Sequence, residues 1–281
     1  MVWRIVDGHD VDLDQVEAFC LAHPAEVALM AEYVHEMRYS HDLRDYLLSV
    51  FDTRDHTLVG VCWLGGNIVP VGLPPGAVKA VVKEIQRRSR RFSSIVGPHD
   101  QVQQLWRHIR GRFGRAREIR EVQPHLEIHN PPLVEADPAV QPVTGGDFDV
   151  VFPAAVSMFT EEVGYSPLTS GGGYERRVRS LIAQGRTLAR IDYTDRGRDV
   201  VFKADLGTIG FGLTQVQGVW INLDYRGRGL AAPAVAAVVN YAHKHFAPTV
   251  SLYVNSFNHA ALATYARVGF QRTDTFTTIL F

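Results

Sequence analysis

The sequence predicts an α/β chain, of the α+β type in its strand pairing, with two similar domains that each hold a mixed, mostly antiparallel sheet flanked by helices. Short β-branched and aromatic runs alternate with helical patterns throughout the 281 residues. A proline-rich stretch with little periodicity, residues 129–142, separates the two halves and is typical of a linker. Residues 216–242 combine a strand, a glycine-rich turn and an apolar helix. We therefore expect one domain at residues 1–128 and a second at residues 143–281.

The first half contains every element of one such domain. A strand at residues 2–6 leads through an acidic turn into a helix at 13–21, and His23-Pro24 separates it from a second helix at 26–37. Strands at 46–51, 58–64 and 68–71, a helix at 77–88, a strand at 92–96, a helix at 102–112 and a strand at 116–123 follow in that order. Gly65-Gly66-Asn67 is a hairpin turn signal, so the strands on its two sides should pair antiparallel.

The second half predicts a similar succession. A helix containing residues 154–162 follows Pro153, a flexible loop is expected at 170–174, and a second helix covers 175–183. Strands at 187–193 and 200–205 precede the strand at 216–221. Pro233 is tolerated only in the first turn of a helix, so the next helix should begin close to Gly229. A strand at 249–254 and a short helix between Asn258 and Gly269 follow.

The composition, with 46% hydrophobic and 21% charged residues, is that of a soluble globular protein. A formal net charge of −1 argues against a protein that works chiefly by binding nucleic acid. Residues 79–120 are strongly basic and residues 1–78 strongly acidic. We interpret them as solvated or mutually facing surfaces rather than as a surface for RNA, DNA or an acidic partner, which is the alternative. The longest apolar run, residues 230–239, is too short to span a bilayer, so no membrane partner is expected.

The cysteines and the N-terminus bear on the compartment. Cys20 and Cys62 lie in hydrophobic surroundings, which favours two free buried thiols over a disulfide. Residues 1–8 lack the basic start and apolar core of a signal peptide. We therefore expect a cytoplasmic protein, and no sequence feature specifies its oligomeric state.

The turn at residues 226–231, Arg-Gly-Arg-Gly-Leu-Ala, is an expected anion site. Successive backbone N–H groups at a helix N-terminus point toward one spot, and the helix dipole favours negative charge there. Gly227 and Gly229 let the main chain approach a ligand without a Cβ in the way. The turn lacks the Gly-Lys-Ser/Thr of a Walker loop and the Gly-x-Gly-x-x-Gly of a dinucleotide fingerprint.

This turn resembles the pyrophosphate loop of the GNAT acetyltransferases, Arg/Gln-x-x-Gly-x-Gly/Ala. A stretch further along the chain resembles a second GNAT signature, Asn-x-x-Ala-x-x-x-Tyr followed by Gly-Phe. The positions that match the two signatures are Arg226, Gly229 and Ala231, and then Asn258, Ala261, Tyr265, Gly269 and Phe270. Both signatures occur in order, each on the expected element, which indicates a GNAT domain in the second half.

The first half also follows the GNAT order of elements. The chain therefore resembles tandem two-domain actinobacterial GNAT proteins with an architecture like that of mycothiol synthase. Leu73-Pro74-Pro75 stands where a first pyrophosphate loop would lie, and prolines lack the N–H donors that a phosphate cradle requires. The first domain is therefore expected to be degenerate.

The resemblance implies an acetyl-CoA-dependent N-acetyltransferase. It would transfer an acetyl group to a primary amine of a small-molecule, peptide or protein acceptor, which attacks the thioester directly. The strand that splays from its neighbour would pair with the pantetheine arm and donate an N–H to the thioester oxygen. Cofactor contacts are implied for Val219, Trp220 and Ile221, for Arg226, Gly227, Arg228, Gly229, Leu230 and Ala231, and for Asn258, Ala261 and Tyr265.

The same resemblance makes Tyr265 the general acid for the departing thiolate, because a phenol with a reference pKa of roughly 10 is protonated at neutral pH. The alternative is that Tyr265 only packs. No carboxylate lies on the splayed strand, where the family often places a base. Asp205, Glu161 and Glu162 are the candidate bases, and each has the alternative of a plain surface carboxylate. No metal is expected in the site.

Two further alternatives stay open. One is a non-catalytic acyl-CoA-binding regulatory protein whose first half binds a partner, which the missing obvious base keeps in consideration. The other is an acyl donor longer than acetyl. Turnover of amines, measured beside binding of acetyl-CoA, separates the enzyme from the regulator.

Overall fold

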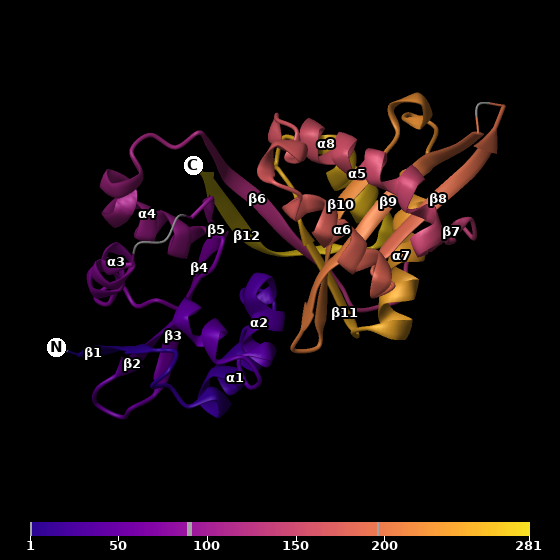
Figure 1. The fold of residues 1–281 in the computed structure, drawn as a ribbon. Coiled ribbons are helices and arrows are strands. Elements are labelled where there is room, and N and C mark those ends of the chain that lie inside the picture. The colour runs from indigo at the N-terminus through magenta and orange to yellow at the C-terminus, as the bar shows by residue number, and fades with distance from the viewer. Residues whose placement is uncertain (1, 89–91, 196) are drawn as a thin grey trace.

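The computed structural model describes residues 2–88, 92–195 and 197–281 (Figure 1). The first half contains β1 (Trp3–Asp7), α1 (Leu13–Ala22), the 3-10 helix η1 (Ala28–Met30), α2 (Ala31–Glu36), η2 (His41–Tyr46), β2 (Leu47–Asp52), β3 (Leu58–Leu64), β4 (Asn67–Val71), α3 (Val78–Arg87), β5 (Ser94–Pro98), α4 (His99–Phe113) and β6 (Glu118–Ile128).

The second half repeats this order of strand, two helices, three strands, helix, strand, helix and strand. It contains β7 (Val140–Pro142), η3 (Gly145–Asp147), α5 (Phe148–Val163), η4 (Pro167–Ser170), α6 (Gly173–Ala183), β8 (Thr187–Thr194), β9 (Gly197–Gly210), β10 (Leu213–Ile221), η5 (Leu223–Tyr225), α7 (Ala231–His245), β11 (Thr249–Tyr253), α8 (His259–Val268) and β12 (Gln271–Leu280).

The strands form one continuous mixed sheet in the order β1-β2-β3-β4-β5-β12-β6-β11-β10-β9-β8-β7. The α/β fold class is therefore confirmed, and the two expected sheets are joined edge to edge. The sheet is internally symmetric, because each strand of the first half has a counterpart six strands later. Read from the β7 end, the counterparts follow one another in the same order as the strands read from the β1 end. At the centre the last strands of the halves are exchanged: β6 pairs with β11, and β12 pairs with β5 as well as with β6. Figure 1 shows β6 and β12 passing together between the two halves.

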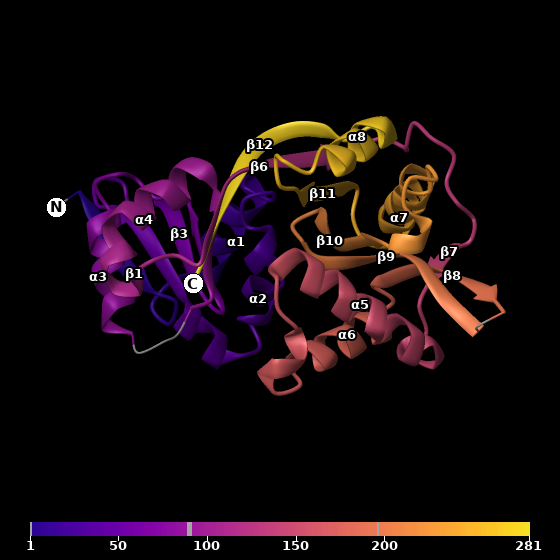
Figure 2. The ribbon, with the colours of Figure 1, turned by 90° about the horizontal axis from the view of Figure 1, so that it is seen from above.

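Helices cover both faces of the sheet in the second half (Figure 2). Leu188 packs in the core that contains the apolar residues of α7 and α8, whereas its neighbour Ala189 packs in the core of α5 and α6. Successive residues of a strand point to opposite faces, so the two helix pairs lie on opposite sides. The first half has two such cores as well, one with α1 and α2 and one with α3 and α4.

Most predicted elements are present within a few residues of their expected bounds, although β6 and β9 each end five residues later than expected, and three predictions differ more. The helix expected at 26–37 is divided into η1 and α2. The helix expected after Pro153 begins at Phe148 and contains Pro153, because burial of Phe148 and Val151 outweighs one lost backbone hydrogen bond. The loop expected at 170–174 ends earlier, since α6 begins at Gly173. Residues 140–142 of the expected linker form β7, and the division into domains stays a prediction.

β12 is an element that the sequence did not predict. Its first four residues, Gln271 to Asp274, are polar and exposed, so they lack the apolar alternation of a half-buried strand. Cys20 and Cys62 are buried free thiols, as predicted. None of the described helices combines the length and the apolar character needed to cross a membrane.

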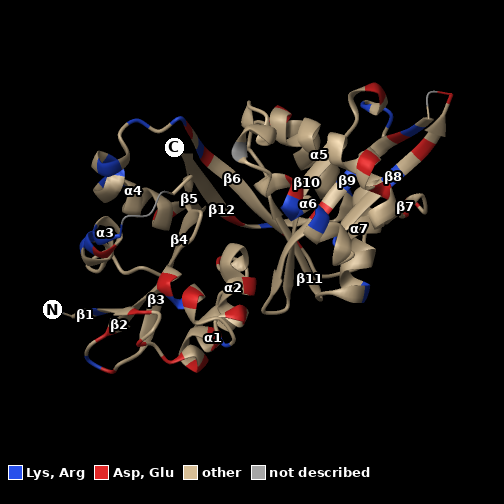
Figure 3. Ribbon diagram, in the orientation of Figure 1, with Lys and Arg blue, Asp and Glu red and all other residues tan. Residues whose placement is uncertain are grey.

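Charge is divided within the first half. Figure 3 shows Lys and Arg gathered on α3 and α4, and Asp and Glu on α1 and α2. Arg88, after α3, donates to the Asp7 carboxylate on β1 at 2.5 Å. At this contact the basic segment faces the acidic one within the same half, which is one of the two interpretations given above.

His125 on β6 predicts a dependence of stability on pH. It is fully buried, and burial lowers the pKa of His125 to about 4. In the unfolded chain its pKa is near 6.5. Between these values the unfolded state binds the proton and the folded state does not, so stability falls as the pH is lowered from about 6.5 to about 4, by about 1.4 kcal/mol per unit. Chemical denaturation of His125→Gln at pH 4.5 and 7 should show a smaller loss than the wild type, and an equal loss would contradict this assignment.

Candidate functional site

The site begins where two parallel strands separate. β10 and β11 pair at only three positions, ending with Gln215 opposite Ser251. Beyond them β10 pairs only with β9, and β11 only with β6, in the part of the chain that the structure describes. One edge of β10 from Val216 to Ile221 is therefore without a strand partner. An extended ligand can hydrogen-bond to such an edge as a strand would.

A β-bulge shapes β10 in this opening. The register with β9 shifts between Gln217 and Trp220, and Gly218 has φ +58°. A Cβ at Gly218 would lie 2.9 Å from Met158 Cε of α5 and 3.2 Å from Asp205 Oδ2. Both the backbone conformation and the close approach of α5 therefore require glycine. The bulge brings the β10 main chain close to the side chains of α5 and β9.

The loop after β10 offers unpaired amides. Gly227 and Gly229 have φ of +76° and +75°, and a Cβ at either would meet no atom within 4 Å. Within the described residues, no acceptor is recorded for the N–H groups of residues 227–230. These amides lie directly before α7, which begins at Ala231. They have the geometry of an anion cradle, and they fit the diphosphate of a coenzyme A molecule.

The side chain of Arg226 is held by protein groups. Its Nη2 donates to Glu161 Oε2 at 2.6 Å, and its Nε donates to the carbonyl of Ile221 at 3.0 Å. Glu161 also accepts from Trp220 Nε1 at 2.8 Å. Glu161 thus ties α5 to the open strand and to the loop. Arg228 Nη2 donates to the Asp224 carbonyl at 2.6 Å, and the Arg228 side chain is otherwise exposed beside the open amides of the loop.

Asn258 and Tyr265 occupy the beginning and the last turn of α8. The Asn258 side chain accepts from the Ala261 N–H at 3.1 Å, which confirms it as the N-cap. Tyr265 is 6% exposed, and its ring packs edge-on against that of Phe270 at 5.7 Å between ring centroids. Burial raises the pKa of Tyr265, and the Glu162 carboxylate raises it further. Tyr265 is therefore a protonated phenol at neutral pH, as a general acid must be.

The charge of Glu162 acts on three tyrosines of the second half. Its carboxylate contributes to the raised pKa of Tyr265, Tyr253 and Tyr174, after burial in each case. It pairs with Arg120 Nη1 of β6 at 3.2 Å, and its side chain is 53% exposed. The Glu162 carboxylate therefore acts electrostatically on Tyr265, and both residues were predicted as catalytic.

Asp205 lies deeper in the sheet. Its carboxylate is paired with the fully buried ammonium of Lys203 and accepts from Thr187 Oγ1 at 2.8 Å. It also contributes to the raised pKa of Tyr174, whose hydroxyl donates to the Ala155 carbonyl at 2.8 Å. Asp205 is therefore near the same region as Glu162, but it is a member of a buried ion pair.

Sequence reasoning missed several residues of this site. Lys203, Tyr174 and Tyr253 were not singled out, and no local pattern distinguishes them from core or surface residues. Gly218 did carry a signal, since a glycine inside a β-branched run indicates a bulge. No group of His, Cys, Asp and Glu that could hold a metal ion is found among the described residues.

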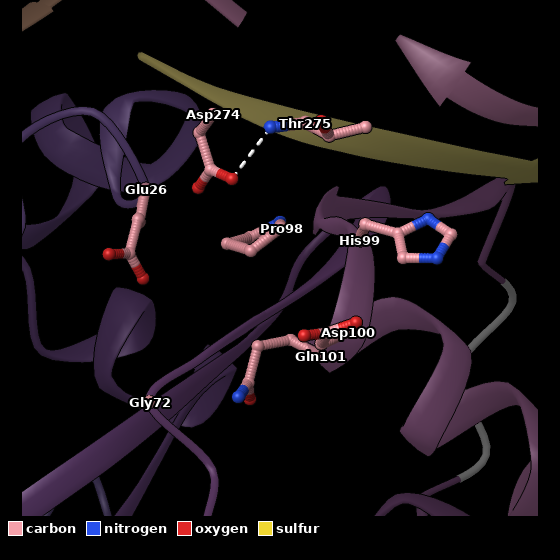
Figure 4. Close-up of a pocket in the computed structure, with 8 residues that line it drawn as sticks. All are labelled: Glu26, Gly72, Pro98, His99, Asp100, Gln101, Asp274 and Thr275. Carbon is pink, nitrogen blue, oxygen red and sulfur yellow. Dashed lines mark hydrogen bonds between the residues drawn. The ribbon is translucent and has the colours of Figure 1, made fainter. Parts of the chain in front are cut away.

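The first half has a corresponding opening between β4 and β5, but a backbone amide there is already hydrogen-bonded and the nearby cavity carries carboxylates. β4 and β5 pair only at Asn67 with Ser94 and at Ile68 with Ile95 before they separate. The Leu73 N–H that follows β4 is already bound by Gln101 Oε1 of α4 at 2.8 Å. A cavity of about 410 Å³ lies beside this contact (Figure 4), and its lining includes the carboxylates of Glu26, Asp100 and Asp274.

Two family models match the sequence. Residues 142–271 match the model described as "Acetyltransferase (GNAT) domain", and residues 47–151 match "Domain of unknown function (DUF4081)". No curated protein matches the chain.

Solved structures share the fold at low sequence identity. A GCN5-related N-acetyltransferase from Sphaerobacter thermophilus aligns with a TM-score of 0.61 at 16% identity, covering 99% of this chain and 94% of that one. A GNAT-family acetyltransferase from Colwellia psychrerythraea gives 0.56 at 12%, covering 100% of both chains. A tandem GNAT protein from the clavulanic acid biosynthesis pathway gives 0.54 at 14%, covering 98% and 97%. Residues 142–271 thus match a GNAT acetyltransferase domain model behind residues that match DUF4081, and the solved structures share the fold of the chain.

Proposed function

We propose that the protein is an acetyl-CoA-dependent N-acetyltransferase in which the second half holds the cofactor and the first half is a degenerate GNAT-like domain. The acceptor is a primary amine that attacks the thioester directly. The observation that carries the proposal is the coincidence of an unpaired β10 edge with a row of open amides at the start of α7. Acetyl-CoA supplies the activated acyl group, and the side chains described above supply orientation and proton transfer.

Most of the predicted contacts have a role in this proposal, whereas Arg226 is held by Glu161 and by the carbonyls of Ile221 and Leu223. The amides of residues 227–231 bind the diphosphate, and the free edge of Val219, Trp220 and Ile221 pairs with the pantetheine arm. The Ile221 carbonyl accepts a hydrogen bond from Arg226 and therefore points away from β9. Because main-chain groups alternate in direction along a strand, the N–H and C=O of Val219, two residues earlier, also point away from β9 toward the open edge. Asn258 and Ala261 border the cofactor from the start of α8. Tyr265 donates its proton to the departing thiolate.

Glu162 is the base that we favour, acting through water because no carboxylate lies on β10. Asp205 is the rival, and the two are separated by stability as well as by activity. Asp205→Asn leaves the Lys203 ammonium buried and unpaired, which should destabilise the fold by about 3–5 kcal/mol.

Glu162→Gln, at a half-exposed side chain, should change stability little and lower kcat by about 10²–10⁴-fold. Thermal melting and steady-state kinetics of both variants provide the check. A Glu162→Gln enzyme with wild-type kcat would remove Glu162 from the mechanism.

The function itself is tested by incubating the full chain with acetyl-CoA and a panel of amines, while calorimetry measures acetyl-CoA binding. Acetylated product is the expected result. Saturable binding without turnover of any amine would instead support a non-catalytic acyl-CoA-binding regulatory protein. Replacing acetyl-CoA by longer acyl-CoA donors in the same assay defines the chain length.

We predict one acetyl-CoA per chain. The first half has Pro74 and Pro75 in place of N–H donors, and its Leu73 amide is already bound by Gln101. Its cavity carries carboxylates, which repel phosphates. Calorimetric titration of the intact chain should give a stoichiometry near one. A stoichiometry of two would contradict the proposal of a degenerate first half.

A further inference from the structure

The first half reaches the second half at the hairpin that joins β9 to β10. η1 contacts both of these strands and α2 contacts β9, and Figure 2 shows α2 on the side of the first half that faces them. We call residues 206–213 the hairpin tip. A Cβ added at Gly210 would lie 2.6 Å from the Cβ of Ala31, the first residue of α2. Only glycine allows the tip to lie this close to α2.

Glu32 on α2 joins the two halves through two donors. Its Oε1 accepts from the Ile209 N–H of the tip at 2.9 Å and is also paired with the Arg186 guanidinium, in the loop before β8. The Arg186 side chain is 7% exposed, and its Nε donates to the Leu206 carbonyl at 2.9 Å. Glu32 therefore holds the main chain of the tip directly and, through Arg186, a second time. Hydrogen bonds to an ionised group are the stronger kind, and these lie largely out of solvent.

Phe211, in the turn of the tip, has a backbone conformation that depends on the first half. Its φ is +52°, a region that a bulky side chain rarely adopts. Its ring stacks on that of His35 of α2 at 4.5 Å between ring centroids, and it packs against the core of α1 and α2. A strained backbone persists where the surrounding structure holds it. The first half thus determines the shape of this turn.

The same core of the first half also touches the other strand of the opening. Tyr253, the last residue of β11, packs against the core of α1 and α2 as Phe211 does. Among the described residues, β10 and β11 are joined only by the three pairs next to the tip, which end with Gln215 opposite Ser251. The direction in which β10 leaves β11 is consequently set where the first half contacts both strands.

We propose that the first half braces the opening between β10 and β11, and that Glu32 is the positioning residue of this brace. This role rests on the acetyltransferase function proposed above, because the braced edge of β10 is the one assigned to the pantetheine arm. The first half then contributes to acetyl transfer by keeping the edge in the conformation that binds the cofactor. When only a fraction of the molecules has the edge in place, the apparent affinity falls by that fraction.

Glu32→Ala in the full chain tests the brace, since it removes both hydrogen bonds of the carboxylate. We expect the KM and the Kd for acetyl-CoA to rise by about tenfold or more, the effect of losing hydrogen bonds to a charged group. At saturating acetyl-CoA, kcat should stay within about twofold of the wild type. Hydrogen exchange measured by mass spectrometry should be at least about tenfold faster for the amides of residues 213–217, because local opening of this segment becomes easier.

Glu17→Ala is the matched control. Glu17 on α1 is also a half-buried glutamate hydrogen-bonded to an arginine, but its partner Arg38 belongs to the first half. Loss of this pair should change neither the KM for acetyl-CoA nor the exchange of residues 213–217.

Gly210→Ala reaches the tip by another route and keeps the test valid if Glu32→Ala does not fold. The added Cβ would collide with Ala31 and move the tip off α2, so the KM and the exchange should rise as in Glu32→Ala. Gly66→Ala is its control, because a Cβ at Gly66, in the turn between β3 and β4, would meet no atom of the described residues within 4 Å.

Three results would overturn the brace while turnover by the wild type upholds the acetyltransferase. They are an unchanged KM and exchange in Glu32→Ala and Gly210→Ala, a lower melting temperature as their only change, and an equal response in Glu17→Ala. If the wild type neither acetylates an amine nor binds acetyl-CoA, hydrogen exchange decides alone. Faster exchange of residues 213–217 in both tip variants would then support the brace although the acetyltransferase fails, and unchanged exchange would refute it.

Discussion

Tyr265→Phe should lower kcat by about 10²–10⁴-fold, the range for loss of a general acid, while the affinity for acetyl-CoA stays within about twofold. The substitution removes one hydroxyl and keeps the ring that packs against Phe270, so the core beneath α8 should be preserved. Steady-state kinetics with the amine selected by the acceptor assay, beside calorimetry with acetyl-CoA, measure the two quantities.

Tyr241→Phe is the control for this prediction. The Tyr241 hydroxyl donates to the Gly185 carbonyl at 3.0 Å, in the loop before β8, so its removal tests the loss of a phenol outside the opening. Its kcat should equal that of the wild type. If Tyr265→Phe retained full activity, Tyr265 would be a packing residue and the proton would have to come from water.

Gly229→Val should abolish detectable binding of acetyl-CoA. A β-branched residue at φ +75° is strained, and its side chain would stand where the main chain is open to a ligand. The protein should still fold, because Gly229 is exposed and contacts no other part of the chain at its Cβ position. Calorimetry measures binding, and circular dichroism verifies folding.

Gly114→Val provides the same strain elsewhere. Gly114 ends α4 with φ +71° and also has no atom within 4 Å of its Cβ position. It should lose a similar amount of stability and bind acetyl-CoA as the wild type does. Unchanged affinity in Gly229→Val would show that this loop does not bind the cofactor.

The conformation of the glycine loop and the cap of α8 were predictable because their signals are local. Gly227, Gly229 and Asn258 act through the conformation and capping of their own few residues, and those requirements appear directly in the sequence. The side-chain contacts around Glu161 and Asp205 were not predictable, because they join distant segments. Glu161 meets Arg226 across 65 positions, and Thr187 and Asp205 meet only through the register of β8 with β9. The position of Glu161 on a helix does not indicate that its carboxylate will pair with an arginine so far along the chain.

The strand exchange was hidden for a related reason. β5 and β11 each have an open edge with which a further strand can pair. No pattern within residues 118–128 or 271–280 indicates whether β6 or β12 will pair with β5 or with β11. That choice depends on how the two halves pack, which no short pattern records. The twelve-stranded sheet was consequently expected as two sheets.

The exchange has a consequence for biosynthesis. β12 is made long after β5, yet it completes the edge of β5. His99, which follows β5, is hydrogen-bonded to Thr277, 178 residues further along the chain. While the ribosome is still translating the second half, the edge of β5 that β12 will occupy has no strand partner. Such an edge can pair with strands of other nascent chains. The first half can therefore reach its native state only after residues 271–280 have been synthesised, and a protein truncated before residue 271 would leave it permanently incomplete.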